Sequence, residues 1–358
     1  MAHDIATSPP ASARPTAGIV ATGTGAPPAL EAVSLTKTYG SVRAIEEVSF
    51  TVARGEVVGF LGLNGAGKST TMRILAGLMP ATSGRAYVSG LAVASHPDEV
   101  KRRLGFMPEN NPLPEDMRVI EYLRFRARLK EVRWRRISAR VEEAMELCGL
   151  HHSARRRLIG TLSKGFRQRV GIADAILSEP EVIIMDEPTI GLDPHQILGI
   201  RRLIDSLRGR LTVLLSSHIL PEIELCCDRV MIINQGRIVA SGTSASLRRD
   251  LIKRAVWRVR LQGDVPAFEK LVTDVSPHLR VASRTGPDAD GFTELHLEGP
   301  AEEWSAGEKL LETAVRRGHW RIRELAHLDP GLEQVFLAAT KHNSEETLTP
   351  FAKLRAKK

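Results

Sequence analysis

Apolar runs of strand length alternate with longer helical patterns over the first two thirds of the chain. Residues 57–61, 182–185 and 213–215 are continuous or nearly continuous apolar runs, which is typical of parallel strands buried on both faces. The apolar residues after position 169 instead recur with a helical period. The pattern from residue 30 to about residue 242 therefore predicts one α/β domain, with a helical insert at about 116–158.

The last third of the chain has a different pattern. The predicted order is strand, helix, strand, strand, helix, strand, at residues 256–261, 266–275, 279–283, 292–297, 301–317 and 320–325. This order is that of a small ferredoxin-like α+β unit. We expect a further helix at about 330–340 to close the unit, so that the accessory domain covers residues 250–341.

Both ends of the chain are expected to lie outside these domains. Residues 1–28 are rich in Pro, Ala, Thr and Gly and lack apolar periodicity, which predicts a disordered tail. Its brief apolar segment at 18–21 is too short for a secretion signal and lacks a basic flank. Residues 342–358 form a second, basic tail.

Composition narrows the class of protein. A length of 358 residues indicates two domains, and 42% hydrophobic residues are enough for packed cores. No stretch approaches the ~20 consecutive apolar residues that cross a bilayer. Three cysteines, Cys148, Cys226 and Cys227, provide neither a disulfide framework nor spaced metal ligands, which favours a reducing cytoplasm.

The segment that follows the first apolar run carries the strongest chemical signal. Residues 62–70, GLNGAGKST, match the phosphate-loop pattern between a strand and a helix. Glycines let the backbone turn its N–H groups toward phosphate, Lys68 neutralises phosphate oxygens, and the Ser69 hydroxyl suits Mg²⁺. The predicted phosphate-binding residues are Gly62, Asn64, Gly65, Ala66, Gly67, Lys68, Ser69 and Thr70. The alternative is a glycine turn that only joins strand to helix.

Two carboxylates end the second apolar run. Asp186 and Glu187 directly follow residues 182–185, at the edge of the sheet where ligands of parallel sheets bind. We expect Asp186 to hold Mg²⁺ through water and Glu187 to polarise the water that attacks the γ-phosphate. An acidic surface pair after a core strand is the alternative, and the phosphate loop makes it the weaker one.

A third segment connects these motifs to a known family. Residues 162–169, LSKGFRQR, resemble the signature motif of ATP-binding cassette (ABC) proteins, in which a serine hydroxyl and glycine amides grip the γ-phosphate bound to a partner subunit. Ser163 and Gly165 match that role. Lys164 stands where the family usually has glycine, and it places an added cation near phosphate. Alone, such a stretch is more often a helix cap.

Further segments resemble the family's remaining elements, in the family's order. Tyr39 resembles the aromatic residue on which adenine stacks, and residues 191–194, GLDP, resemble the loop that touches the opposite subunit. His218 resembles the switch histidine that senses the γ-phosphate. Glu109 stands where the family usually has a glutamine that reaches the metal, so it is a candidate Mg²⁺ ligand. Taken one at a time, each of these residues has a simpler alternative role, as a residue that packs at the edge of a sheet, belongs to a turn or only supports the fold.

The resemblance implies a fold and an activity. The implied fold is a P-loop NTPase of ABC type over residues 29–245, with a RecA-like core, an antiparallel β subdomain and an α-helical subdomain. A ferredoxin-like domain after it, ending in LEQVFL at 332–337, resembles ATPases of ABC-2 exporters, and residues 107–111 and 191–196 resemble the gliding-motility branch. The implied protein is an ATPase that binds ATP and Mg²⁺.

The resemblance also implies partners. We expect a homodimer of cassettes that drives a separately encoded membrane permease from the inner face of the cell membrane, in the cytoplasm. Nucleic acid is not an expected partner. A soluble ABC ATPase with a non-membrane partner is the alternative, and a non-enzymatic scaffold would require lost catalytic residues, whereas Lys68, Asp186, Glu187 and His218 are all present.

Arginines crowd the predicted helical insert. They are Arg124, Arg126, Arg128, Arg133, Arg135, Arg136 and Arg155 to Arg157. Such a surface suits anionic lipid head groups, an acidic partner loop or nucleic acid, and a solvated helix face is the simpler alternative. The formal net charge of +8 does not decide among them, because net charge bears on association and not on fold.

Overall fold

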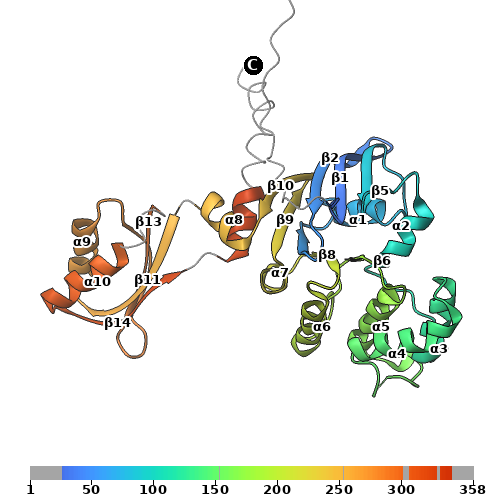
Figure 1. Cartoon of the computed structure of the whole chain (residues 1–358). Helices are drawn as coiled ribbons and strands as arrows, with labels where there is room; N and C mark the ends of the chain where they lie inside the picture. Colours follow the sequence, from blue (N-terminus) through green and yellow to red (C-terminus); the bar gives the residue numbers. More distant parts are fainter. Residues whose placement is uncertain (1–25, 153, 253, 301–305, 329–330, 341–358) are drawn as a thin grey trace, which may run out of the picture.

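The structure is a computed structural model of the whole chain, and it describes residues 26–152, 154–252, 254–300, 306–328 and 331–340. The two predicted tails, 1–28 and 342–358, lie outside these ranges except for residues 26–28. Three sheets and their helices make up the described part (Figure 1).

A six-stranded sheet forms the centre of the N-terminal domain, in the order β10-β9-β3-β8-β7-β6. Its strands are β3 (Val57–Leu61), β6 (Leu104–Met107), β7 (Val182–Met185), β8 (Thr212–Ser217), β9 (Arg229–Asn234) and β10 (Arg237–Gly242). Only β10 runs antiparallel to its neighbour. Every residue of β3, β7 and β8 is buried, which explains their continuous apolar runs.

Five helices accompany this sheet and its connections. They are α1 (Lys68–Leu75), α2 (Pro97–Arg103), α6 (Pro194–Leu207), α7 (Leu220–Cys226) and α8 (Ser244–Leu251). A second, antiparallel sheet, in the order β2-β1-β4-β5, shares an apolar core with α1 and one face of the central sheet. Its strands are β1 (Leu30–Tyr39), β2 (Val42–Val52), β4 (Ser83–Val88) and β5 (Leu91–Ala92).

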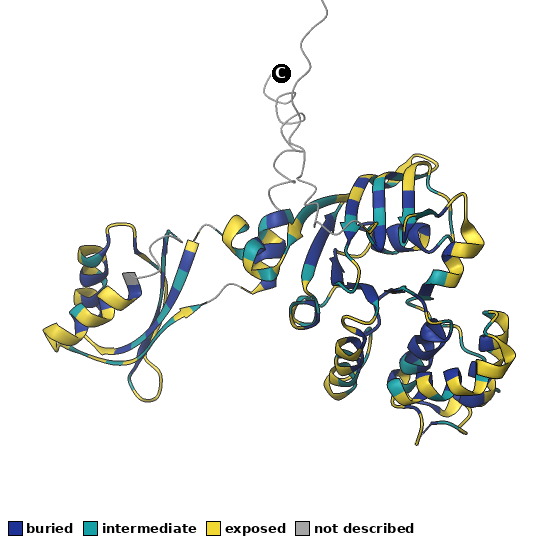
Figure 2. Ribbon diagram, in the orientation of Figure 1, coloured by how far each residue is buried: buried dark blue, intermediate teal, exposed yellow. Residues whose placement is uncertain are grey.

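The helical insert predicted at about 116–158 packs with the helix that follows it in a lobe that we call the helical subdomain (residues 119–176). It contains α3 (Val119–Leu129), η1 (Trp134–Arg136), α4 (Ile137–Leu147), η2 (Ile159–Thr161) and α5 (Lys164–Ile176). Leu123, Met145 and Ile172 are fully buried in the apolar core that joins these helices to the central sheet. Figure 2 shows their buried residues facing one another and exposed residues on the outside.

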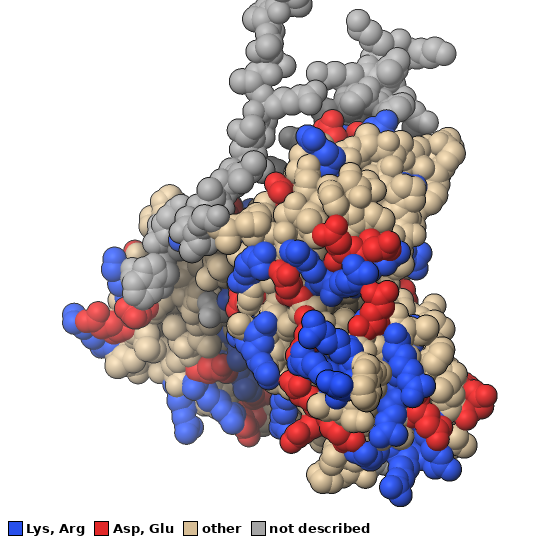
Figure 3. All heavy atoms as spheres, turned by 45° about the vertical axis from the view of Figure 1, so that its right-hand side comes forward, with Lys and Arg blue, Asp and Glu red and all other residues tan. Residues whose placement is uncertain are grey.

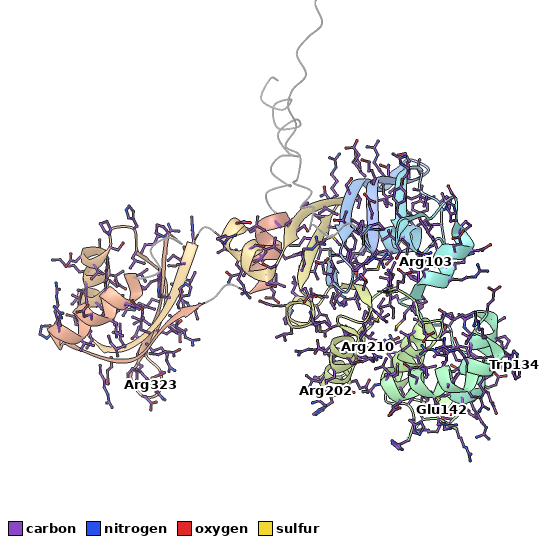
Figure 4. The ribbon with its side chains drawn as sticks, viewed as in Figure 1. Arg103, Trp134, Glu142, Arg202, Arg210 and Arg323 are labelled. Carbon is purple, nitrogen blue, oxygen red and sulfur yellow. The ribbon has the colours of Figure 1, made fainter. Side chains whose placement is uncertain are left out.

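Many arginines of the helical subdomain are ion-paired within the chain. Arg126 Nε lies 3.0 Å from Asp174 Oδ1, Arg136 Nη2 lies 3.0 Å from Glu179 Oε1, and Arg155 pairs with Glu142. Figure 3 accordingly shows acidic and basic side chains interspersed on the face of the molecule that it presents. Trp134, which the sequence analysis did not single out, is 77% exposed at the outer edge of the subdomain (Figure 4).

The C-terminal third contains the predicted ferredoxin-like unit (residues 254–328). Its elements are β11 (Arg254–Gly263), α9 (Val265–Val275), β12 (Arg280–Thr285), β13 (Thr293–Pro300), α10 (Ala306–Arg317) and β14 (Trp320–Leu328). The antiparallel sheet has the order β12-β13-β11-β14, and α9 and α10 cover one of its faces (Figure 1). Trp257, Phe268 and Leu310 belong to a core of its own.

The expected closing helix is present at 332–340 but packs elsewhere. Leu332, Val335, Phe336 and Ala339 belong to the same apolar core as Leu247 of α8. Figure 1 shows this helix, in red, beside α8. The chain therefore leaves the N-terminal domain, forms the ferredoxin-like unit, and returns. Among the described residues, no helix combines the length and the apolar character needed to cross a membrane.

Candidate functional site

The loop between β3 and α1 forms a tight cradle, and steric constraints explain why glycines occupy it. Gly65 and Gly67 have φ values of 80° and 108°, in the left-handed region that side chains disfavour. A Cβ at Gly62 would lie 2.6 Å from the carbonyl oxygen of Ile233. Ala66 is buried beneath the loop, whereas Asn64 and Gly65 are exposed. The conformation of the predicted phosphate loop therefore depends on its glycines, which distinguishes it from a turn that only joins strand to helix.

Lys68 opens α1 and is held at the bottom of the cradle. Its ammonium donates to the carbonyl oxygens of Gly62 at 2.8 Å and Leu63 at 3.3 Å. It also lies 3.4 Å from Glu187 Oε1, and both side chains are buried. Ser69 and Thr70, next along the helix, are half-buried. A phosphate oxygen entering the cradle would meet this cation and the loop amides together.

The two predicted carboxylates follow β7 and are both buried. The Ser216 hydroxyl of β8 donates to Asp186 Oδ1 at 2.6 Å and accepts from the Glu187 amide at 2.8 Å. Glu187 has a φ of 50°, which turns its side chain out of the strand direction. Ser216 was not predicted as a site residue, although a polar residue ending the apolar run at 213–215 was a usable signal.

Glu187 and His218 form a close pair. His218 Nδ1 lies 2.7 Å from Glu187 Oε2, while Glu187 Oε1 is buried and has no hydrogen-bond partner in the part of the chain that the structure describes. These side chains open into a cavity of about 300 Å³. It is lined by Leu63, Asn64, Gly65, Lys68, Ser69, Glu109, Glu187, Ile190 and His218. Seven predicted site residues thus meet at one cavity from four segments of the chain.

Eight predicted residues do not line this cavity. Five of them are next in sequence to residues that do, namely Gly62, Ala66, Gly67, Thr70 and Asp186, whereas Ser163, Gly165 and Tyr39 are not. Ser163 caps α5, and its hydroxyl accepts from the Phe166 amide at 3.4 Å. Gly165 lies in the first turn, where a Cβ would lie 2.4 Å from Gln196 Oε1. Tyr39, at the end of β1, is 47% exposed and donates its hydroxyl to the Met79 sulfur at 3.2 Å. A single chain therefore assembles the cradle and the cavity, while Ser163 and Gly165 lie outside them.

Comparison with known proteins decides the family. The ABC transporter family model matches residues 45–190. The daunorubicin/doxorubicin resistance ATP-binding protein DrrA of Streptomyces peucetius is 34% identical over 325 residues, which are 90% of this chain and 95% of that protein. The linearmycin resistance ATP-binding protein LnrL of Bacillus subtilis is 31% identical over 316 residues, which are 87% of this chain and 98% of that protein.

The chain belongs to the ABC transporter family. A solved ATP-binding subunit of an ABC transporter shares 34% identity and a TM-score of 0.56, covering 62% of this chain and 92% of that one. The protein is an ATP-binding and ATP-hydrolysing subunit of an ABC-2-type export system, and its N-terminal domain is the ABC cassette.

The cassette holds a further polar group that the sequence analysis missed. Glu222, in the first turn of α7, hydrogen-bonds Thr189, which follows Glu187 by two positions. Burial raises the pKa of Glu222, against the opposing effects of that hydrogen bond and of His218. Its Oε2 is buried and has no hydrogen-bond partner within the described ranges. The pair joins the helix after His218 to the loop after Glu187.

The loop at residues 191–194 begins the next helix of the cassette. Gly191 has a φ of 67°, and the Asp193 side chain caps α6 by accepting from the Gln196 amide at 2.9 Å. The Lys164 ammonium would lie 2.4 Å from a Cβ at Gly191. Lys164 therefore extends from the signature motif to this loop, and a side chain at position 191 would displace it.

Proposed function

We propose that two copies of this chain clasp two ATP molecules between them, and that hydrolysis reopens the pair. The distribution of the site over the surface supports this proposal. Lys68, Glu187 and His218 line one cavity, while Ser163 and Gly165 lie outside it. A second copy, related by two-fold symmetry, would place its Ser163 side chain and Gly165 amide at the cavity of the first copy. The first copy would place the same groups at the cavity of the second.

Mg²⁺ fits the residues around the cavity. Ser69 and Glu109 both line it, and the buried Asp186 lies at the end of the adjoining strand. Bound there, Mg²⁺ would neutralise phosphate charge.

Hydrolysis then requires an oriented water. Glu187 Oε1 is buried, lies 3.4 Å from the Lys68 ammonium and has no hydrogen-bond partner among the described residues, so it can accept a proton from a water facing the γ-phosphorus. A bond forms between the water oxygen and phosphorus, the bond to the bridging oxygen of ADP breaks, and the proton passes to Glu187. His218 holds the other carboxylate oxygen at 2.7 Å and so keeps Glu187 oriented. Tyr39 would stack on the adenine.

The work of this cycle is done on a membrane partner. The relatives named above are resistance ATP-binding proteins. We therefore place this chain at the inner face of the membrane, bound to a separately encoded permease. Closing of the dimer would move that permease, as domain closure does in other nucleotide-driven systems.

Replacing the catalytic carboxylate tests the central claim. In Glu187→Gln, ATP should still bind, while hydrolysis stops because an amide cannot take the proton from water. The variant should therefore accumulate as a closed dimer, and light scattering with ATP and Mg²⁺ should show the molar mass doubling from 39.3 kDa.

Two controls separate the halves of the site. Glu187→Gln combined with Lys68→Ala should lose ATP binding. Glu187→Gln combined with Ser163→Arg should bind ATP but stay a single chain, because the arginine blocks the surface at Ser163 and Gly165 that would cover the partner's ATP. A Glu187→Gln protein that binds ATP and never dimerises, or that hydrolyses ATP at the parent rate, would refute the proposal.

A further inference from the structure

The turn that follows α3 exposes two large apolar side chains. We call residues 128–135 the basic turn; it runs from the last two residues of α3 to the first two of η1. Its Trp134 is 77% exposed and its Leu129 is 57% exposed, and Figure 4 shows Trp134 at the outer edge of the helical subdomain. The basic turn therefore leaves apolar surface in water that a partner could cover.

Three arginines of the basic turn lie beside these apolar side chains without a carboxylate partner. Arg128, Arg133 and Arg135 are exposed, and none of them forms an ion pair with any residue that the structure describes. The Arg135 guanidinium instead lies over the Trp134 ring, 5.1 Å from its centroid. A guanidinium is weakly hydrated and can donate two parallel hydrogen bonds to a phosphate, so these groups suit a phosphate-bearing partner.

The other charged residues of the basic turn are paired within the chain. Glu131 is its one acidic residue, and Glu131 Oε2 lies 2.9 Å from Arg102 Nη2 of α2. Lys130 Nζ lies 3.7 Å from Asp174 Oδ1 of α5, and Val132 packs against the apolar core. These contacts fix the turn on the subdomain, and the charge that it leaves unpaired is positive.

We propose that the basic turn binds the anionic phospholipid head groups of the membrane beside the permease. The inference rests on the proposed function in one respect, because that function places the chain at the inner face of the membrane. The three guanidinium groups would contact lipid phosphates. Trp134 and Leu129 would enter the boundary between head groups and acyl chains, where indole rings and amphipathic segments are stabilised.

The alternation of charged and apolar side chains favours a lipid surface over other anionic partners. Single-stranded nucleic acid is bound where several aromatic rings stack on successive bases, whereas Trp134 is the one aromatic residue of the basic turn. An acidic protein loop would bury a continuous apolar centre with charges at its rim. Here Arg133 separates Trp134 from the rest of the turn, and Arg128 precedes Leu129, as in segments that lie in a head-group layer.

Vesicle binding by the full chain without nucleotide tests the proposal. The chain should bind vesicles of mixed phosphatidylcholine and phosphatidylglycerol, bind pure phosphatidylcholine far less, and dissociate as salt is raised. Arg133→Gln with Arg135→Gln should weaken this binding about 25-fold, because each basic residue at an anionic membrane surface contributes about fivefold. Arg85→Gln with Arg321→Gln is the matched control. It removes the same charge at exposed positions of β4 and β14 and should bind like the parent.

Two readouts separate lipid contact from a loss of folding. Both double variants should hydrolyse ATP at the parent rate, because none of the substituted residues lines the nucleotide cavity. Brominated acyl chains should quench the tryptophan emission of the parent, and this quenching should be lost in Trp134→Phe, whereas Trp257 is buried.

Three outcomes would overturn the proposal. The first is equal vesicle binding by the two double variants, and the second is equal quenching in the parent and in Trp134→Phe. The third is a chain that ignores vesicles and binds a single-stranded oligonucleotide or an acidic peptide through Arg133 and Arg135. If Glu187→Gln never dimerises with ATP, the proposed function fails, whereas vesicle binding needs no dimer and still decides the role of the basic turn.

Discussion

Glu187, the proposed catalytic carboxylate, has an unusual backbone conformation. A φ of 50° is rare outside glycine, and holding such a conformation costs roughly 1–3 kcal/mol. The Ser216 hydroxyl accepts from the Glu187 amide, and it donates to Asp186 at the same time. One buried serine therefore orients both carboxylates, and the strained turn directs Glu187 into the cavity beside Lys68.

His218 is expected to act through Glu187. Its ring lies 2.7 Å from the carboxylate, so His218→Ala should release Glu187 from its orientation and lower kcat about 100-fold, within the range for positioned acid–base groups. ATP affinity should not change, because the cradle amides and Lys68 remain. Steady-state hydrolysis and a fluorescent-nucleotide titration would measure the two quantities.

A distant histidine provides the control for this prediction. His96 is exposed and precedes α2, away from the cavity residues, so His96→Ala should hydrolyse ATP at the parent rate. A His218→Ala protein with the parent kcat would show that Glu187 keeps its orientation without the ring.

At the scale of elements, apolar runs and helical periods predicted most of the fold. The strand predicted at 182–185 has those bounds, and the run at 213–215 lies inside the longer β8. The last strand was predicted to end at residue 325 and extends to Leu328, where pairing with β11 continues past a register shift. Pairing with a neighbour decides where a strand ends, and a single chain segment does not contain that information.

The helix at 332–340 shows the same limit more strongly. Its apolar face was visible in the sequence, but the surface that covers it was not. Because Val335 is fully buried in the core of the cassette, Val335→Ala should destabilise the cassette by about 2 kcal/mol. Thermal unfolding with and without ATP would identify the cassette transition, since only that transition should shift with nucleotide.

Leu337 is the matched control on this helix. It is 52% exposed, so Leu337→Ala should leave the cassette transition where it is in the parent. A Val335→Ala protein that loses stability only in a nucleotide-insensitive transition would assign the helix to the ferredoxin-like unit instead.

At the scale of the whole molecule, the ferredoxin-like unit has the construction of an insertion. It has its own core, and its first and last strands pair side by side, with Val256 opposite Leu328. Its two ends therefore lie about 5 Å apart, the usual separation across an antiparallel pair. Excising such a unit need not disturb the domain that carries it.

Removing the unit tests this organisation. Replacing residues 254–328 with a short Gly–Ser linker should leave a folded cassette that hydrolyses ATP at the parent rate, because the helix at 332–340 can still return to its site. An ATPase assay and a circular dichroism spectrum would measure the result. A shortened protein that is unfolded or inactive would show that the unit supports the cassette directly.

The sequence by itself determined the chemistry and the local elements of this protein. Phosphate loop, paired carboxylates and signature motif are short segments whose residue types and spacing already specify what they can bind. Buried strands and amphipathic helices follow from the same local patterns.

Only the tertiary structure decided which distant residues meet. It placed Ser216 between Asp186 and Glu187, Glu131 beside Arg102, and the last helix on the cassette. The physical reason is that the type of a side chain shows whether it must be hydrogen-bonded or buried in the fold. Which residue provides that contact depends on how elements far apart in the chain pack together.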